Sequence, residues 1–294
     1  MANLKAIRSR IKSVQATQKI TRAMRLVAAA KVRRAQLRVQ AARPFTTRVV
    51  KLLREVVRDT AAVDLLELPL LARRDRIKDV GIIVLSSDRG LCGSYNTNVF
   101  RVVLERLEQL QGEGKTPHLI LVGLKAVAFF RHVKVDRLKT YTLLPAIPTV
   151  QEAKLIADQA AEMYVGGKLD AVEIIGTQFI SMLRSQVVNT KFLPVELPPP
   201  EEHHALEPEM LFEPTIQEVL ERELLPKYIE NVIFQALLDA SASELAARMN
   251  AMTNASNNAR DLISALTLVY NKARQASITQ ELLEIVGGAE ALKG

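Results

Sequence analysis

Residues 86–96 form the stretch of this chain whose residue types come nearest to a chemical site. They join a short apolar run, residues 80–85, to a helix-like stretch from about Asn96 to Gln111. In α/β folds, a turn between a buried strand and a helix is where phosphate groups bind. This turn has no Lys followed by Ser or Thr and no GxGxxG spacing, so neither common phosphate motif is present. The residues favour a tight strand-to-helix turn, with nucleotide binding as the alternative.

Two other groups of residues could support chemistry. Cys92, the single cysteine, could act as a nucleophile, but no His lies near it in the sequence, so a buried structural thiol is favoured. His203 and His204, flanked by Glu201 and Glu202, could touch a metal, but a solvated linker is favoured because the segment is rich in Pro. The four histidines fit no Ser-His-Asp or HExxH arrangement. We therefore expect no catalytic residue, no cofactor and no metal.

Both ends of the chain are long stretches that contain nothing to stop a helix. Residues 1–43 and residues 227–286 have no Gly and no Pro. A helix rises about 1.5 Å per residue, so sixty residues would reach roughly 90 Å, which is far longer than a globular domain needs. Such helices need a partner or a mechanical task, and the simplest partner for each end is the other end.

Apolar residues in both ends recur at the three- and four-residue spacing of a coiled coil. We expect Pro44 to interrupt the first helix, which resumes over residues 49–57, and the second helix to run from after Pro226 to Gly287-Gly288. The N-terminal seam is predicted to contain Leu4, Ile7, Ile11 and Val14, and less cleanly Ile20, Met24 and Val27. The C-terminal seam is predicted to contain Leu245, Met249, Met252, Ser256, Ala259, Ile263, Leu266, Tyr270 and Ala273.

The middle of the chain alternates short apolar runs with helix-like stretches, which predicts a small Rossmann-like βαβ domain with a mainly parallel sheet. Strands are expected at residues 80–85, 119–122, 171–175 and 185–192, and helices at 96–111, 124–131 and 150–165. The predicted class is α/β, an antiparallel coiled coil of the long terminal helices plus this central domain. The predicted domains are a helical arm (1–70), the Rossmann-like domain (76–195), a Pro/Glu-rich linker (196–214) and the C-terminal coiled-coil helix (215–294).

Positive charge is confined to one end of the chain. Residues 1–54 hold fifteen Lys and Arg and no Asp or Glu, whereas the other 240 residues hold 25 basic and 32 acidic side chains. This arm could grip nucleic-acid phosphates, but its cations are spread around the helix, which suits a basic rod inside an acidic protein sleeve. It also resembles a transit peptide, although the pattern runs on through residues 24–31, so a structural helix is favoured. No run of eighteen apolar residues exists, and we expect no membrane span.

Four segments together resemble the gamma subunits of F-type ATP synthases, the central shafts of rotary motors. They are Ile20-Thr21-Arg22-Ala23-Met24-Arg25-Leu26-Val27-Ala28-Ala29-Ala30-Lys31, Ser87-Asp88-Arg89-Gly90-Leu91-Cys92-Gly93, Glu244-Leu245-Ala246-Ala247-Arg248-Met249 and Tyr270-Asn271-Lys272-Ala273-Arg274-Gln275-Ala276-Ser277-Ile278-Thr279-Gln280-Glu281-Leu282. The resemblance runs from about Leu4 to Leu292, and four long motifs in order make it specific.

The resemblance implies a non-catalytic rotor subunit. The coiled coil would stand in a ring of three alpha and three beta subunits, with the βαβ domain on the epsilon subunit and the c-ring of the membrane sector. It implies no nucleic-acid partner, and membrane association only through the complex, on the cytoplasmic side of the inner or thylakoid membrane. The residues that match the family's contacts with the moving beta loop are Met24, Arg248, Arg274, Gln275 and Thr279. Met24 also fits a seam position.

One departure from the family concerns the region of residues 196–214. Chloroplast and cyanobacterial relatives carry an inserted segment there, with a dithiol in the chloroplast form, whereas this chain has a short linker and one Cys. The ending at residues 286–292 nevertheless resembles that lineage. Two other classes compete with the rotor: a nucleotide-binding α/β enzyme with helical dimerisation arms, and a basic coiled-coil protein that binds nucleic acid.

Overall fold

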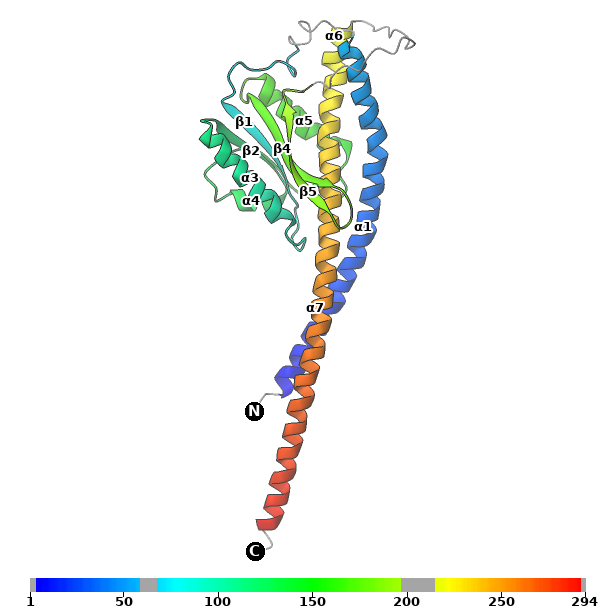
Figure 1. The fold of residues 1–294 in the computed structure, drawn as a ribbon, viewed down its shortest axis with the longest axis vertical. Coiled ribbons are helices and arrows are strands. Elements are labelled where there is room, and N and C mark those ends of the chain that lie inside the picture. Colours follow the sequence, from blue (N-terminus) through cyan, green and yellow to red (C-terminus); the bar gives the residue numbers. More distant parts are fainter. Residues whose placement is uncertain (1–3, 59–67, 197–214, 292–294) are drawn as a thin grey trace. The chain divides into compact units, whose positions relative to one another are not determined.

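The computed structural model describes residues 4–58, 68–196 and 215–291. These residues fall into two compact units, which we call the central unit (residues 30–247) and the terminal unit (residues 1–29 and 248–294). Two long helices, α1 (Leu4–Arg58) and α7 (Leu225–Ala291), contribute to both units (Figure 1). A short helix, α6 (Ile216–Val219), and a π-helical turn, η1 (Leu220–Leu224), lead directly into α7.

The central unit is built on a five-stranded sheet in the order β3-β2-β1-β4-β5. Four strands are parallel, and β5 returns antiparallel beside β4 as a hairpin. The strands are β1 (Asp79–Leu85), β2 (Thr116–Val122), β3 (Asp136–Tyr141), β4 (Ala171–Phe179) and β5 (Ser185–Leu193), and the helices between them are α3 (Tyr95–Gly112), α4 (Leu124–Phe130) and α5 (Val150–Val165). The order 3-2-1-4 is the one with which Rossmann folds begin, so the expected fold class is confirmed.

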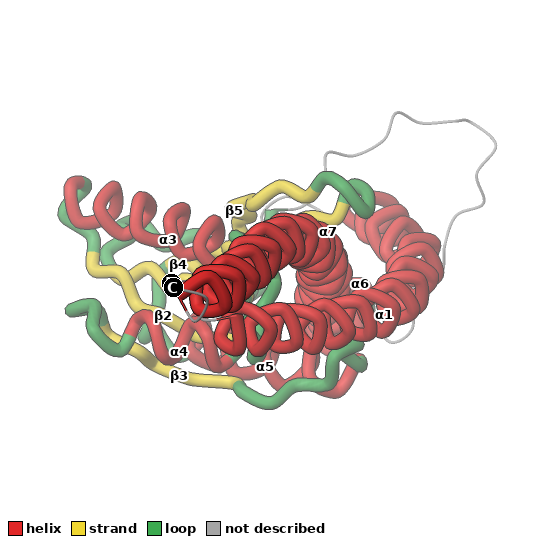
Figure 2. The backbone as a smooth tube through the Cα atoms, turned by 90° about the horizontal axis from the view of Figure 1, so that it is seen from below, coloured by secondary structure: helices red, strands yellow, loops and turns green. Residues whose placement is uncertain are grey.

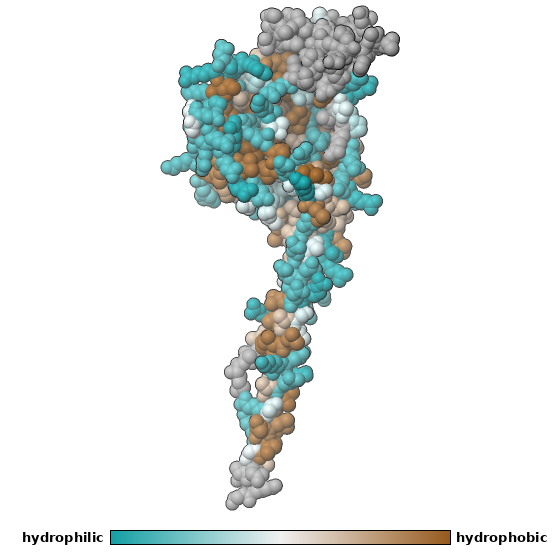
Figure 3. Space-filling view, in the orientation of Figure 1, coloured by the Kyte–Doolittle hydropathy of each residue, from teal (hydrophilic) through white to brown (hydrophobic). Residues whose placement is uncertain are grey.

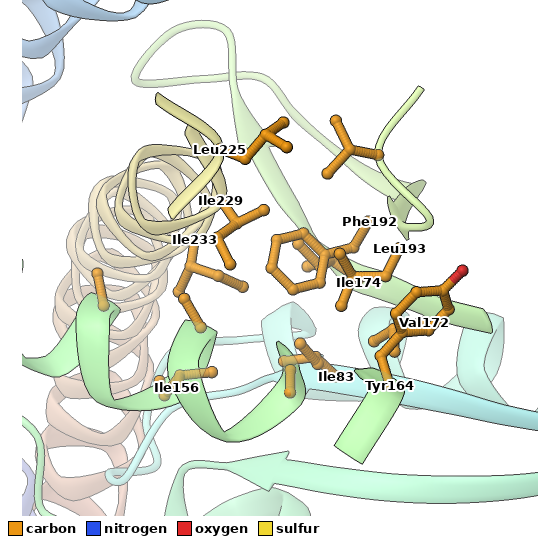
Figure 4. Close-up of a cluster of buried hydrophobic side chains, with 14 of the residues drawn as sticks. Ile83, Ile156, Tyr164, Val172, Ile174, Phe192, Leu193, Leu225, Ile229 and Ile233 are labelled. Carbon is orange, nitrogen blue, oxygen red and sulfur yellow. The ribbon is translucent and has the colours of Figure 1, made fainter. Parts of the chain in front are cut away.

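Helices cover both faces of this sheet, which explains why β1 is a continuous apolar run. Successive strand side chains point to opposite faces. Ile82 and Val84 therefore pack with α3 and α4, whereas Ile83 and Leu85 pack on the face that carries α5. On that second face α7 also meets the sheet: Figure 4 shows Ile229 and Ile233 of α7 in the same cluster as Ile83, Ile174 and Phe192.

The sequence does not predict β3. Only one of its six residues, Tyr141, is buried, because β3 is an edge strand with no apolar run to mark it. Backbone pairing with β2 holds it, and a side-chain bridge adds to that pairing. The two ring nitrogens of His118 on β2 lie 2.9 Å from Asp79 Oδ1 and 3.0 Å from Asp136 Oδ2, so one imidazole ties together three neighbouring strands.

Within the central unit α1 and α7 lie side by side (Figure 2), and their shared clusters show that they run antiparallel. Residues 32–39 of α1 share a buried cluster with residues 238–246 of α7. Later along α1, Val49, Leu53 and Val56 share a cluster with Leu225 and Ile229, which come earlier in α7. Higher numbers in one helix therefore meet lower numbers in the other, as predicted.

Three predicted helix breaks are wrong. Pro44 lies inside α1, which continues because the buried residues Val39 and Val49 hold the helix in place on either side of it. Pro226 lies inside a continuous helical run, where the wider π-helical turn immediately before it accommodates a residue without an N–H. Gly287 and Gly288 do not end α7, because neither adopts the positive φ that a glycine cap requires.

Candidate functional site on the terminal helices

In the terminal unit, small and polar side chains join α1 to α7. The buried residues there are Thr21, Ala28, Met252 and Ala259. Gln18 Nε2 on α1 donates a hydrogen bond of 3.5 Å to the carbonyl oxygen of Ser256 on α7. Short side chains let helix axes approach closely, as the sequence predicts, but they bury little apolar area. At Thr21, Ala28 and Ala259 the pairing therefore depends on close packing more than on buried apolar area.

The predicted N-terminal seam is wrong at Ile20 and Val27, whereas Met24 is half-buried, as a seam position should be. Ile20 and Val27 are 60% and 57% exposed, whereas Thr21 and Ala28, one position later in each case, are buried. The seam keeps its regular three-and-four spacing, but some of its positions hold small or polar residues. A search for apolar residues alone does not find such positions. The displaced apolar residues therefore lie on the outer face of α1.

The predicted C-terminal seam is confirmed. Between Arg260 and Gln280 every residue is exposed except five half-exposed ones, which are Ile263, Leu266, Tyr270, Ala273 and Ser277. The first four are predicted seam positions, and the fifth continues the same spacing. Outside this seam α7 exposes apolar side chains, among them Leu268 at 72% and Leu283 at 67%. Figure 3 shows the result as apolar and polar patches that alternate along the surface of the terminal unit.

The structure divides the five predicted contact residues into two groups. Met24 and Arg248 are both half-buried. The hydrogen bond between Gln18 and Ser256 sets an antiparallel register that places Met24 level with Asn250, within one helical turn of Arg248. A single partner loop at this level could therefore touch both side chains.

The second group begins at Arg274. At 1.5 Å per residue, Arg274 lies about 36 Å along α7 from Asn250, the residue level with Met24. Arg274, Gln275 and Thr279 are all exposed. The Thr279 hydroxyl donates to the Gln275 carbonyl oxygen at 3.0 Å, which satisfies it within the helix. Among the described residues, the Arg274 guanidinium and the Gln275 carboxamide have no side-chain partner, so both are available to another protein.

The turn at residues 86–96 is closed by its own hydrogen bonds. The Ser87 N–H donates to Asn96 Oδ1 at 3.1 Å, and the Ser87 hydroxyl donates to the Arg89 carbonyl oxygen at 2.7 Å. Asp88 Oδ1 accepts from the Leu124 N–H at 2.8 Å, so a carboxylate already occupies the N-terminus of α4. A phosphate group there would meet that negative charge. The contacts support the tight-turn interpretation.

Cys92 belongs to the same turn. It is 2% exposed, and its Sγ accepts a hydrogen bond from Asn96 Nδ2 at 3.3 Å. A thiol that is buried and held in this way supports the structural interpretation. Next to it, burial and the nearby carboxylate of Glu244 raise the pKa of Tyr95, whose hydroxyl donates to the Ala240 carbonyl oxygen at 3.2 Å. His203 and His204 lie outside the described residues.

Comparison with known proteins identifies the family. A family model described as ATP synthase matches residues 3–292. The ATP synthase gamma chain of a Cyanothece species is 44% identical over 318 aligned positions that cover all of both chains, and that of Thermosynechococcus vestitus is 45% identical with the same coverage. This chain belongs to the family of ATP synthase gamma chains. The gamma chain is therefore a non-catalytic, central-stalk subunit of a membrane-bound complex.

Solved structures agree on the fold. A chain of the Euglena gracilis mitochondrial ATP synthase has a TM-score of 0.62 at 19% identity and covers 98% of this gamma chain and 94% of its own length. A chain of the Tetrahymena thermophila central stalk and c-ring structure has a TM-score of 0.56 at 24% identity, covering 81% and 99%. The sequence alignments are longer than 294 residues, so these cyanobacterial relatives contain residues that this chain lacks. Among the described residues, no helix of the gamma chain is long and apolar enough to cross a membrane.

Proposed function

We propose that this gamma chain transmits torque between the c-ring of the membrane sector and the catalytic beta subunits, and so couples ion translocation to ATP synthesis or hydrolysis. In this role α7 turns within the ring of three alpha and three beta subunits, and the sheet-containing domain rests on the epsilon subunit and the c-ring. The complex would place the gamma chain on the cytoplasmic side of the inner or thylakoid membrane. The five contact residues would meet the moving loop of beta.

The exposed surface of α7 carries this proposal. A shaft must touch its bearing at every angle without binding tightly at any one of them. Residues 262–280 contain two charged side chains, Lys272 and Arg274, and no carboxylate, and most of the stretch is exposed. Contacts there would be apolar or polar and weakly attractive, because no carboxylate in the described part of the chain forms an ion pair with either cation. Such contacts can break and reform as the shaft turns.

The replacement of Met24 by Lys tests the proposal. Lys at this half-buried position would add a charge able to bind an acidic beta loop at one rotor angle, and a charge-assisted contact is worth roughly 1.5 to 3 kcal/mol. Rotation would then pause in one deep well. We expect Met24→Lys to assemble and keep much of its ATPase rate, yet to lose coupling between hydrolysis and ion pumping, more so at higher temperature. Met24→Leu is the matched control and is expected to be near neutral, because it keeps shape and polarity.

Two outcomes would contradict the placement of Met24 against beta. If both variants fail to assemble, Met24 is a packing residue of the α1–α7 seam. If Met24→Lys assembles and pumps ions normally, no acidic loop reaches this level of the shaft. Proton pumping by membrane vesicles, measured beside the ATPase rate of the same preparation, distinguishes these results.

A second experiment addresses the distal group. Arg274→Ala and Lys272→Ala each remove one exposed cation from neighbouring positions of α7. If Arg274 contacts beta and Lys272 does not, we expect Arg274→Ala to lower the ATPase rate of the assembled complex several-fold, since a charge-assisted contact is lost, while Lys272→Ala stays within about twofold. Equal effects of the two variants would show that only net charge matters at this level.

A further inference from the structure

We infer that the central unit carries a binding site for a small phosphorylated molecule at the amino edge of its sheet. A cavity of about 310 Å³ opens there, at the first residues of β1 and β4 and the last residues of β5. Ligands of Rossmann-like folds usually bind at the opposite, carboxyl edge of the sheet. In this chain the turn at residues 86–96 follows the carboxyl end of β1, so the amino-edge cavity is a separate feature. It also lies outside the contacts with beta proposed above.

The charged side chains around the amino-edge cavity leave a positive excess. Five cations line it, which are Arg73, Arg74, Arg106, Lys115 and Lys191. Three carboxylates line it, which are Asp170, Glu173 and Glu196. If all of these groups are ionised, the lining has an excess of two positive charges, and Glu113, which pairs with Lys115 at 2.6 Å, lowers the local excess to one. An anion entering the cavity would still be attracted.

The three carboxylates are already occupied by contacts within the protein. Glu173 takes a forked pair of bonds from Arg106, at 2.5 and 2.9 Å, and a third from Asn189 at 2.6 Å. Asp170 Oδ2 accepts the backbone N–H groups of residues 78 and 79 at 2.8 and 2.9 Å. Glu196 accepts from Lys191 at 2.8 Å. Among the described residues, none of the three forms an ion pair with Arg73 or Arg74, although Asp170 and Arg74 attract each other electrostatically.

Arg73 and Arg74 are the two cations of the cavity that no described carboxylate contacts in an ion pair. Arg74 is held in place by the protein: its Nη2 donates to the Tyr164 carbonyl oxygen at 2.9 Å, and its guanidinium lies 5.6 Å from the centre of the Tyr164 ring. A guanidinium has five N–H donors, so an arginine fixed through one of them keeps others for a ligand. Fixed guanidinium groups match the geometry of phosphate oxygens.

The volume and the apolar lining of the cavity indicate the kind of molecule to which the phosphate group is attached. Its volume corresponds to roughly ten water molecules at about 30 Å³ each, which is more than one phosphate group needs. Apolar side chains line the rest, among them Ile77, Leu110, Leu193 and Pro194. The cavity therefore suits a phosphate group attached to a small organic body, with the phosphate at the arginines and the body against the apolar residues.

Calorimetric titration of the full chain tests this inference, with inorganic pyrophosphate as the probe of the cationic part. We expect saturable binding that Arg73→Gln weakens by at least about tenfold, the effect of losing one charge-assisted contact. The matched control is Arg101→Gln, which removes an equal charge from an exposed position on α3, where Arg101 pairs with Glu105. It should leave pyrophosphate affinity within twofold. Arg74→Gln should also weaken binding, and an unchanged circular dichroism melting curve would show that the fold is kept.

Three results would overturn the inference. The first is the absence of saturable pyrophosphate binding. The second is an equal loss of affinity in Arg73→Gln and Arg101→Gln, which would reduce the effect to the overall charge of +8. The third concerns lipid headgroups: sedimentation with phosphatidylcholine–phosphatidylglycerol vesicles that depends on Arg73, in a chain that ignores pyrophosphate, would assign the cavity to a membrane surface. None of these assays measures rotation. The phosphate-site inference can therefore be refuted while the torque proposal stands, and the torque proposal can be refuted while the phosphate-site inference stands.

Discussion

The ion pair between Arg106 on α3 and Glu173 on β4 offers a sharp test of how the central unit is held together. Glu173 is 8% exposed, and its neighbours determine whether its charge can be tolerated. Burial, the largest single influence, raises the pKa of Glu173, but the hydrogen bonds from Arg106 and Asn189 outweigh it, so the pKa lies below its ordinary value. Replacing Arg106 with Met removes the cation and keeps much of the apolar stem.

The size of the effect follows from what the variant leaves behind. Removal of one partner of a buried ion pair costs about 3–5 kcal/mol, because the other charge stays buried. Asn189 would still donate to Glu173, and the Arg106 side chain is 22% exposed, so water could enter where it was. We therefore expect the low end of that range, a loss of about 3 kcal/mol in the free energy of unfolding at pH 7.

The sign of the pH dependence distinguishes this mechanism from simple loss of packing. In the natural chain the lowered pKa of Glu173 contributes stability above its unfolded pKa of about 4.3, and this contribution is lost as pH falls through the folded value. In Arg106→Met burial is less opposed, so the folded pKa rises above the unfolded one. The variant's deficit should then shrink as pH falls through that raised value, to below about 1 kcal/mol near pH 3.5.

Urea unfolding followed by tyrosine fluorescence measures this, since four of the five tyrosines lie in the central unit. Arg106→Met combined with Glu173→Gln should recover most of the stability at pH 7, because no buried charge remains. Arg101→Met, on the exposed side of the same helix, should cost less than about 0.5 kcal/mol. The reasoning fails if the Arg106→Met deficit is the same at pH 7 and pH 3.5, or if the double variant is no more stable than the single one.

Three further predictions concern the backbone and the thiol. Gly123→Ala should destabilise the central unit by at least about 2 kcal/mol in urea unfolding, because φ is +99° there and a Cβ would lie 2.4 Å from the Ser86 carbonyl oxygen; near-native stability would contradict the geometry of this turn. Pro44→Ala should raise the free energy of unfolding by about 1–3 kcal/mol in the same assay, since it restores a helical N–H. A lower free energy of unfolding would mean that Pro44 stabilises the folded chain. Oxidant and reductant should leave the ATPase rate of the assembled complex unchanged, because Cys92 is the single thiol and is buried; a reversible several-fold change traced to this subunit would refute that.

Much of the architecture could be predicted from the sequence because its signals are local. A buried parallel strand needs a short β-branched run, and residues 80–85 and 171–175 have one, so β1 and β4 were placed correctly. The C-terminal seam could be predicted because residues 245–273 contain an unbroken heptad series, most of whose members are apolar. The antiparallel direction of α1 and α7 followed from chain connectivity, since the central domain joins the end of one helix to the start of the other. The domain boundaries and the five beta-contact residues remain predictions.

Some features could be determined only from the tertiary structure, because they depend on contacts between residues that are far apart in the sequence. The seam beyond Val14 passes through Thr21 and Ala28, because close approach of α7 favours small side chains there, and hydrophobicity cannot show that. Pro44 stays within a helix because burial on both sides of it outweighs one missing hydrogen bond. The polar edge strand β3 exists because β2 offers it a backbone ladder. The amino-edge cavity likewise contains cations from four separate segments. They come together only in the folded chain, so the local excess of positive charge cannot be read from the sequence.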